Sequence, residues 1–320
     1  MFNRYNIENL KRAINDPSLI ADELFRPVQP FKRFGVYGLP LMASETVHRH
    51  FVSGKEPTSI WNREWDLLVV LDACRAGWLS AVSAEYQILS EVGSIYSVGS
   101  HSAEWINNTF SERYEEQIQN CTYVTANHHS KWMNPDRFAR FEDVTNYEAD
   151  GKPLPAPPAH VVSDQAIRVG RNTNWNKMIV HYMQPHKPFL TRGGERRDVS
   201  IAAEWSTGYK MYRKVINGDL TRNELERAFI NNLRYVLYEV ELLMENINAP
   251  TVAITSDHGN ALGERFLWDH SRGINHPSVR RVPWAECSAE DRESIEPAQY
   301  HTIDKNNKQV EERLRQLGYR

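Results

Sequence analysis

The stretch TVAITSDHGNALGERFLWDH, residues 251–270, decides the fold class. An apolar, β-branched run leads directly into Asp257 and His258, and His270 follows at a fixed distance downstream. Such a run is typical of a strand in a sheet that is covered on both faces, and residues directly after it lie at the carboxyl edge, where α/β proteins bind ligands. The stretch therefore predicts one wall of a binding or catalytic site.

Other apolar runs predict further strands of the same sheet, at residues 65–73, 86–92, 94–98, 121–126 and 177–183. The central part of the first run does not alternate between apolar and polar residues, which favours a strand buried on both faces. Apolar residues at helical spacing predict a long helix over 222–247, and Thr221 and Glu224 fit a capping box at its start. The predicted fold class is α/β, with a central, mostly parallel sheet and helices on both faces.

The composition is that of a soluble globular protein, with 41% hydrophobic and 25% charged residues in 320. Because 38 Lys and Arg residues are balanced by 41 Asp and Glu residues, the charge gives no reason to expect nucleic acid as a partner. No run resembles a signal peptide or a transmembrane segment, so we expect a cytoplasmic protein. The three cysteines are far apart and indicate reduced thiols.

Asp72 follows five apolar residues, so we expect it at the exposed end of the first strand, paired with a cation or a metal ion. The alternative is that Asp72 caps a helix starting near Ala73. Arg75 follows closely and could hold an anionic ligand or form a surface ion pair.

The stretch SVGSHSAEWINNTF, residues 97–110, places two hydroxyls before a predicted helix. We expect Ser100 or Ser102 to be the N-cap of that helix, whose amide groups would favour a bound anion. Either serine becomes a nucleophile only if a metal ion or a base activates it.

In VHYMQPHKPFL, residues 180–190, two prolines bracket His186 and Lys187 and stiffen the loop, which is useful for gripping an anionic group. The alternative is a rigid turn with two exposed polar residues, and His181 is interpreted as a satisfied core or edge histidine. Carboxylate and imidazole ligands from Asp257 and His258 suit zinc, manganese, magnesium or calcium without selecting one of them.

These motifs together resemble the alkaline phosphatase superfamily, and within it the sulfatase and phosphonate monoester hydrolase branch. TSDHGNALGE at 255–264 is similar to the branch's TSDHGxxLGE, and HYMQPHKPF resembles its PHxP segment. VVLDACR resembles an archaeal-type sulfatase-like LDACR group, and INHPSVRRVPW, ending at Trp284, resembles the RVP strand. The resemblance covers about residues 60–285.

The resemblance implies a metal-dependent hydrolase of phosphate or sulfate esters, acting on a glycan or a small anionic ester through a metal-activated serine. It implies Asp72, Asp257 and His258 as ligands of a divalent metal ion. It implies His186 as a contact to the ester or the leaving group, with His270 where the branch usually has a substrate-binding lysine. The remaining substrate-binding candidates are Arg75, Lys187 and, more weakly, His276.

The sequence departs from the branch in two places. The C-x-P-S-R signature of formylglycine sulfatases is absent, and the position of the family's nucleophile points to Ser102, or to Ser100 if the helix begins earlier. The paired carboxylate after the first strand is replaced by Ala73, which favours one metal ion over two.

We expect the chain to divide into an N-terminal helical extension at 1–60, a sulfatase-like α/β catalytic domain at 61–285, which the resemblance covers, and a C-terminal helical appendage at 286–320, where the sequence is polar and helical in pattern. Two alternatives to hydrolysis stay open. One is a transferase that moves a phospho-group onto glycans or lipids, and the other is a non-catalytic, sulfatase-like binding protein. The sequence leaves the oligomeric state open.

Overall fold

The computed structural model describes residues 34, 38–52, 54–145, 156–203, 206 and 208–300. The strands are β1 (Leu67–Asp72), β2 (Val92–Tyr96), β3 (Cys121–Thr125), β4 (Arg140–Asp143), β5 (Lys177–Pro185), β6 (Leu190–Arg192), β7 (Val199–Ile201), β8 (Ala249–Thr255), β9 (Ala261–Leu262), β10 (Trp268–Asp269) and β11 (Arg281–Ala289). The α-helices are α4 (Gly38–His50), α5 (Ala76–Val82), α6 (Ser102–Thr109), α7 (Glu115–Gln119), α8 (Ala159–Asn172), α9 (Lys210–Asn217), α10 (Arg222–Met244) and α11 (Pro277–Arg280).

Seven of the strands form one sheet in the order β2-β11-β8-β1-β5-β3-β4. Strands β4, β3, β5, β1 and β8 pair in parallel, and β11 runs antiparallel to both of its neighbours, β8 and β2. Two short antiparallel pairs, β6 with β7 and β9 with β10, stand apart from this sheet. The predicted mostly parallel sheet is confirmed.

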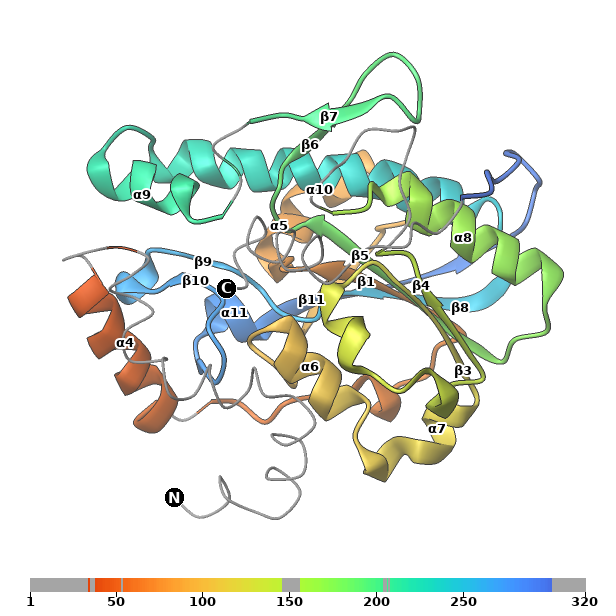
Figure 1. The fold of residues 1–320 in the computed structure, drawn as a ribbon, viewed down its shortest axis with the longest axis horizontal. Helices are drawn as coiled ribbons and strands as arrows, with labels where there is room; N and C mark the ends of the chain where they lie inside the picture. Colours follow the sequence, from red (N-terminus) through yellow and green to blue (C-terminus); the bar gives the residue numbers. More distant parts are fainter. Residues whose placement is uncertain are drawn as a thin grey trace.

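Helices cover both faces of the sheet, as Figure 1 shows with α8 and α10 on one side and α6 and α7 on the other. The side chains of β1 explain this arrangement, since neighbours along a strand point to opposite faces. Leu67, Val69 and Leu71 belong to the core under α5, α8 and α10. Leu68 and Val70 belong to the core under α6 and α7. The absence of alternation in this run therefore predicted the two layers correctly.

The long helix α10 begins where its capping box predicts. The backbone N–H of Glu224 donates to Thr221 Oγ1 at 3.2 Å, and the backbone N–H of Thr221 donates to Glu224 Oε2 at 2.8 Å. The apolar stripe of α10, which includes Phe229 and Leu233, lies in the core. None of the helices in the described parts of the chain combines the length and the apolarity that crossing a lipid bilayer requires.

Three local predictions were wrong. Residues 86–91 form turns, and the edge strand β2 begins only at Val92, because the preceding apolar residues pack against the core from outside the sheet. The N-cap of α6 is His101, whose ring nitrogen accepts from the backbone N–H of Ala103, and neither Ser100 nor Ser102 takes this place. Asp72 is fully buried, although we expected an exposed strand end. The alternative that Asp72 caps the next helix is also wrong, because the N-cap of α5 is Arg75.

The predicted division into an extension, a catalytic domain and an appendage stays a prediction. Most of residues 1–37 and all of residues 301–320, on which parts of it depend, lie outside the described residues.

Candidate active site

The predicted site residues come from the carboxyl ends of neighbouring strands. Asp72 is the last residue of β1, His186 follows β5, and Asp257 and His258 follow β8. Ser102 is the first residue of α6, which follows β2. Because the parallel strands end at the same edge of the sheet, these residues converge there.

Ser102 lies at the centre of the convergence. Its Oγ is 3.1 Å from Nε2 of His258 and 3.4 Å from Oδ2 of Asp72. Nε2 of His258 is in turn 3.5 Å from Oδ1 of Asp72 and 3.3 Å from Oδ2 of Asp257. All four side chains are buried. Three segments that are distant in the sequence therefore meet around one small volume.

Backbone groups hold the Asp257 carboxylate in place. Its Oδ1 accepts hydrogen bonds from the backbone N–H groups of Ala73, at 3.1 Å, and His258, at 2.8 Å. Ala73 has a φ of 63°, a left-handed conformation that is costly for a residue with a Cβ. We infer that this strained turn is kept because it aims the amide of Ala73 at the carboxylate.

The hydrogen-bond partner of Nδ1 determines which ring nitrogen of His258 carries the hydrogen. Nδ1 lies 2.7 Å from the carbonyl oxygen of Gly259, which can only accept, so Nδ1 carries the hydrogen. Burial lowers the pKa of His258 to about 4, which makes the ring neutral and leaves Nε2 as a lone pair. That lone pair faces the two carboxylates and accepts the hydroxyl hydrogen of Ser102.

This group of acceptors fits a divalent cation. Among the residues that the structure describes, Oδ1 of Asp72 and Oδ2 of Asp257 are buried without a hydrogen-bond partner. Burial raises the pKa of Asp72, and the neighbouring Asp257 carboxylate raises it further. In the described part of the chain, the hydrogen bonds and ion pairs of these two buried carboxylates and of the neutral imidazole lone pair include no Lys or Arg, and a metal ion would supply the positive charge. Asp72, Asp257, His258 and the Ser102 hydroxyl are the residues that would hold the ion.

Two further side chains complete this cluster, and sequence reasoning missed both roles. Asn127, just after β3, donates to Oδ2 of Asp72 at 3.0 Å. His181, interpreted as a satisfied core histidine, is bonded through Nδ1 to Tyr123 at 2.8 Å. Its Nε2 has no hydrogen bond within the described chain and lies 3.8 Å from Oδ2 of Asp257. Asn127 could have been found from its place after the strand at 121–126.

A row of imidazole rings leads away from Ser102. The rings of His258 and His270 are stacked with centroids 4.4 Å apart, and the ring of His186 lies 5.1 Å from that of His270. Nδ1 of His186 lies 2.7 Å from the carbonyl oxygen of Lys187, which leaves Nε2 as the nitrogen of this buried ring that can face a ligand. The structure thus brings His186 and His270 to the site.

Asp269 stands behind this row and was not predicted. Its Oδ1 is 2.8 Å from Nδ1 of His270 and accepts from the hydroxyl of Tyr212 at 3.0 Å. Nζ of Lys187 lies 3.3 Å from both carboxylate oxygens of Asp269, and Lys187 is 1% exposed. His186, Asp269 and His270 have the spacing of a second cation site, but the ammonium of Lys187 already neutralises its carboxylate. The signal in the sequence was only that Asp269 adjoins His270.

Two more histidines line the site next to His270. The ring of His101 lies 5.3 Å from that of His270 and 5.2 Å from that of His129. Burial lowers the pKa of both His101 and His129, and nearby Arg272 lowers both further. Neutral imidazoles of this kind offer hydrogen bonds to an anion without adding a fixed charge.

The other predicted residues have partners away from Ser102. Ser100 Oγ lies 2.9 Å from Glu104 Oε2 and 2.9 Å from the carbonyl oxygen of Ser271, which share its one hydrogen. Arg75 binds both carboxylate oxygens of Glu264, at 2.9 and 3.1 Å. His276 is the N-cap of α11 and its Nδ1 lies 2.7 Å from Ser278 Oγ. Substrate contacts from Arg75 and His276 stay predictions, and the geometry favours Ser102 over Ser100 as the nucleophile.

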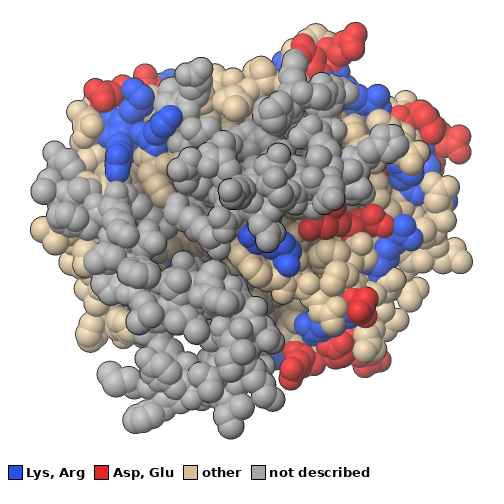
Figure 2. Space-filling model, in the orientation of Figure 1, with Lys and Arg blue, Asp and Glu red and all other residues tan. Residues whose placement is uncertain are grey.

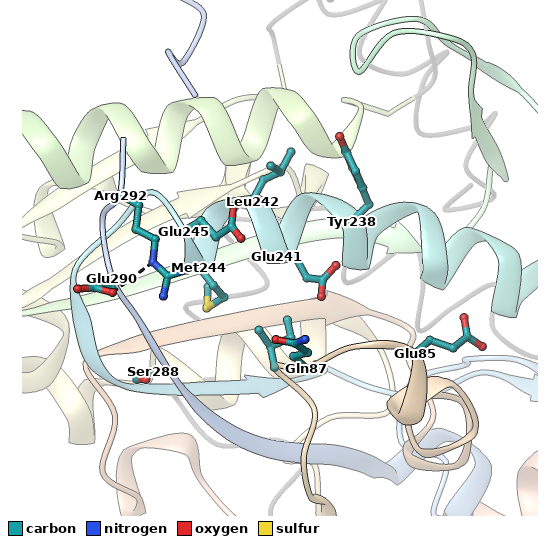
Figure 3. A pocket seen from close by; sticks show the side chains of 11 residues that line it. Glu85, Gln87, Tyr238, Glu241, Leu242, Met244, Glu245, Ser288, Glu290 and Arg292 are labelled. Atoms are coloured by element: carbon teal, nitrogen blue, oxygen red, sulfur yellow. Dashed lines mark hydrogen bonds and ion pairs between the residues drawn. The ribbon is translucent and has the colours of Figure 1, made fainter. Parts of the chain in front are cut away.

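A cavity of about 610 Å³ lies elsewhere, between the end of α10, the residues before β2 and the segment after β11 (Figure 3). Its walls include Glu85, Glu241, Glu245 and Glu290, and Glu290 pairs with Arg292 at 3.2 Å. The cavity shares no residue with the site around Ser102. On the face drawn in Figure 2, basic and acidic side chains of the described residues are interspersed, which agrees with the near-balanced charge of the sequence.

No protein-family model matches the sequence, and no curated protein matches it. Among solved structures, the soluble domain of lipooligosaccharide phosphoethanolamine transferase A from Neisseria meningitidis matches with a TM-score of 0.47 and 15% identity, covering 70% of this chain and 76% of that one. A sulfatase described as putative from Bacteroides thetaiotaomicron gives 0.43 and 10%, covering 76% and 68%. A protein in the alkaline phosphatase superfamily from Vibrio parahaemolyticus gives 0.40 and 10%, covering 83% and 72%.

Because the TM-scores are below 0.5, the functional argument rests on the site itself.

Proposed function

We propose that this protein is a metal-dependent enzyme of the alkaline phosphatase superfamily that cleaves phosphate or sulfate esters of a glycan or a small anionic molecule. The observation that carries the proposal is the position of Ser102 Oγ, 3.1 Å from Nε2 of His258 and 3.4 Å from Oδ2 of Asp72. A hydroxyl that only capped a helix would not be surrounded by buried acceptors that lack a counter-charge.

When bound, a divalent cation would favour the serinate form of Ser102 and neutralise charge on the ester oxygens. The protein's own residues would have separate roles in the reaction. Ser102 Oγ attacks the phosphorus or sulfur atom, and the alcohol leaves. His186 and His270 would contact the ester or its leaving group from beside Ser102. Asn127 keeps Asp72 oriented by its hydrogen bond to Oδ2.

The fate of the serine ester decides between hydrolysis and transfer. Attack by water would make the protein a hydrolase, whereas attack by the hydroxyl of a glycan or lipid would make it a transferase. We propose hydrolysis first, because it requires no partner other than water, and keep transfer as the alternative.

The test is elemental analysis of the purified protein, followed by a panel of aryl phosphate, phosphonate and sulfate esters with and without a chelator. We expect one divalent ion per chain and turnover that chelation removes. Asp257→Asn should lose both the ion and the turnover, whereas Asp291→Asn, which breaks a pair with Arg171 far from the site, should keep both.

Each other result has a clear meaning. Turnover that survives Asp257→Asn would overturn the proposal. A bound ion without turnover of any ester would favour the non-catalytic binding protein. Turnover that rises when an alcohol is added, with formation of a phosphate or sulfate ester of that alcohol, would favour the transferase.

A further inference from the structure

We propose that Asn232, a residue of α10 outside the site, is a positioning residue that holds the turn carrying His186 and Lys187. The inference rests on the proposed function, because it assigns His186 to binding the ester. No motif in the sequence marks Asn232, which lies within the apolar stripe of α10 and is 1% exposed.

All the hydrogen bonds of the Asn232 side-chain amide are to one short segment of backbone, residues 185–190. Its Nδ2 donates to the carbonyls of Pro185 at 2.9 Å and His186 at 3.0 Å, with Pro188 at 3.4 Å. Its Oδ1 accepts from the backbone N–H of Leu190 at 2.9 Å. An amide has two N–H donors and one carbonyl acceptor, so every hydrogen-bonding group of the side chain faces this turn.

A hydrogen bond to Asp72, a residue of the candidate site, holds the turn on the side opposite Asn232. The backbone N–H of His186 donates to the carbonyl of Asp72 at 3.1 Å. This contact joins the turn to the end of β1, where the paired register of β1 and β5 shifts between Leu71 and Asp72. The turn therefore lies between Asp72 and Asn232, and both ends of this arrangement determine where the His186 ring lies.

The position of the turn matters for two side chains at once. The ring of His186 lies 5.1 Å from that of His270, and Nζ of Lys187 lies 3.3 Å from the oxygens of Asp269. If Asn232 is truncated, three buried carbonyls lose their donor and the turn must move or admit water. A misplacement of about 1 Å can cost a site about a hundredfold in rate.

The chain contains a matched control for a purely structural effect. Asn246, just after α10, is also buried, and its Nδ2 donates to the carbonyl of Leu242 at 2.8 Å and to Ser294 at 2.7 Å. Its Oδ1 accepts from the backbone N–H of Ile295 at 3.0 Å and from Arg171 at 2.9 Å. Asn246 thus makes as many contacts as Asn232, and none of them is to residues 185–190.

The experiment compares Asn232→Ala, Asn232→Ser and Asn246→Ala in the full chain. Hydrogen exchange of the peptide covering residues 185–190 reports whether the turn is held. Binding of inorganic phosphate to the metal-loaded protein reports whether the turn's position matters. We expect both Asn232 variants to exchange faster there and to bind phosphate about tenfold or more weakly. Asn246→Ala should lose stability but change neither readout.

A double-mutant cycle shows whether Asn232 acts through His186. In a His186→Ala background, Asn232→Ala should weaken phosphate binding by less than about twofold. An undiminished effect in that background would overturn the proposal. So would phosphate binding by Asn232→Ala that equals that of the unaltered protein, or a failure of both Asn232 variants to fold while Asn246→Ala folds.

The two proposals fail differently. If the unaltered protein binds no phosphate and turns over no ester, the proposed function fails. Hydrogen exchange then still decides whether Asn232 holds the turn, and unchanged exchange in both Asn232 variants would overturn the inference on its own.

Discussion

Ser100 and Ser102 are two positions apart, and the surroundings of their hydroxyls separate their roles. The single hydrogen of Ser100 Oγ has two acceptors within 2.9 Å, Glu104 and the carbonyl of Ser271, and Oγ accepts from the backbone N–H of Ile274 at 3.1 Å, so its bonding is complete within the fold. Ser102 Oγ lies among acceptors that lack a counter-charge. The sequence named both serines, but a helix cap and a nucleophile use the same residue type, so it could not choose between them.

Exchanging the two serines for alanine should give opposite results. Ser102→Ala should lower ester turnover by about a thousandfold or more, because the attacking atom is gone. Ser100→Ala should keep turnover and lose about 1–3 kcal/mol of unfolding free energy, because buried partners lose their hydrogen bonds. Kinetics and urea unfolding of both variants check this. Loss of turnover in Ser100→Ala alone would assign the nucleophile to Ser100.

The buried Lys187 predicts how many metal ions bind. Its ammonium neutralises Asp269 and would repel a divalent ion placed between His186 and His270. The unaltered protein should therefore bind one ion, and Lys187→Met should allow a second at His186, Asp269 and His270. Elemental analysis at saturating metal measures the difference. Two ions in the unaltered protein would contradict this reading of Lys187.

At the scale of elements, the sequence predicted the helices and strands that are marked by a pattern within their own residues. The buried strands β1, β3, β5 and β8 followed from continuous apolar runs, and α10 followed from its spacing and its capping box. The edge strand β2 was placed too early, because the apolar residues before it pack against the core without pairing to a strand. Asn127, Asp269 and Asn232 were missed because their roles depend on contacts between distant segments.

The contribution of the capping box at the start of α10 to stability can be measured. Thr221→Ala removes the side-chain acceptor for the backbone N–H of Glu224 and should cost about 1 kcal/mol of unfolding free energy. Thr221→Ser keeps that oxygen and should cost only a few tenths of a kcal/mol. Urea unfolding of the two variants gives the comparison, and an equal loss in both would mean that the cap contributes little.

At the scale of the whole molecule, one arginine joins the β6–β7 hairpin to two helices. Arg196 donates to Asp164 of α8 at 2.7 Å and to both carboxylate oxygens of Glu239 of α10, with Nε at 2.9 and 3.1 Å from them. Figure 1 shows the hairpin lying outside α10, on the far side of that helix from the sheet. Asp164 and Glu239 are almost fully buried, so Arg196 is the charge that makes their burial tolerable.

Arg196→Met should therefore cost about 3–5 kcal/mol of unfolding free energy at neutral pH. Burial already raises the pKa of Glu239, and loss of Arg196 should raise it further. A carboxyl whose pKa is higher in the folded state takes up protons on folding, so the loss should shrink as the pH falls from about 8 to about 5. Urea unfolding across this range measures it.

Arg197 supplies the control, since it contacts Asp164 at 3.6 Å but its side chain is 42% exposed. Arg197→Met should cost less than about 1 kcal/mol at any pH in this range. A pH-independent loss in Arg196→Met would show that the arginine stabilises the hairpin by packing and not by charge.

The order of strands also governs when the protein becomes functional during its synthesis. Strand β2, which leads into Ser102, pairs with β11 and with no other strand of the described sheet, and β11 spans Arg281–Ala289. A nascent polypeptide that has emerged only as far as His258 has both carboxylates outside the ribosome, but β2 still lacks a neighbour to pair with. The nucleophile therefore joins its partners late, only after β11 has left the ribosome.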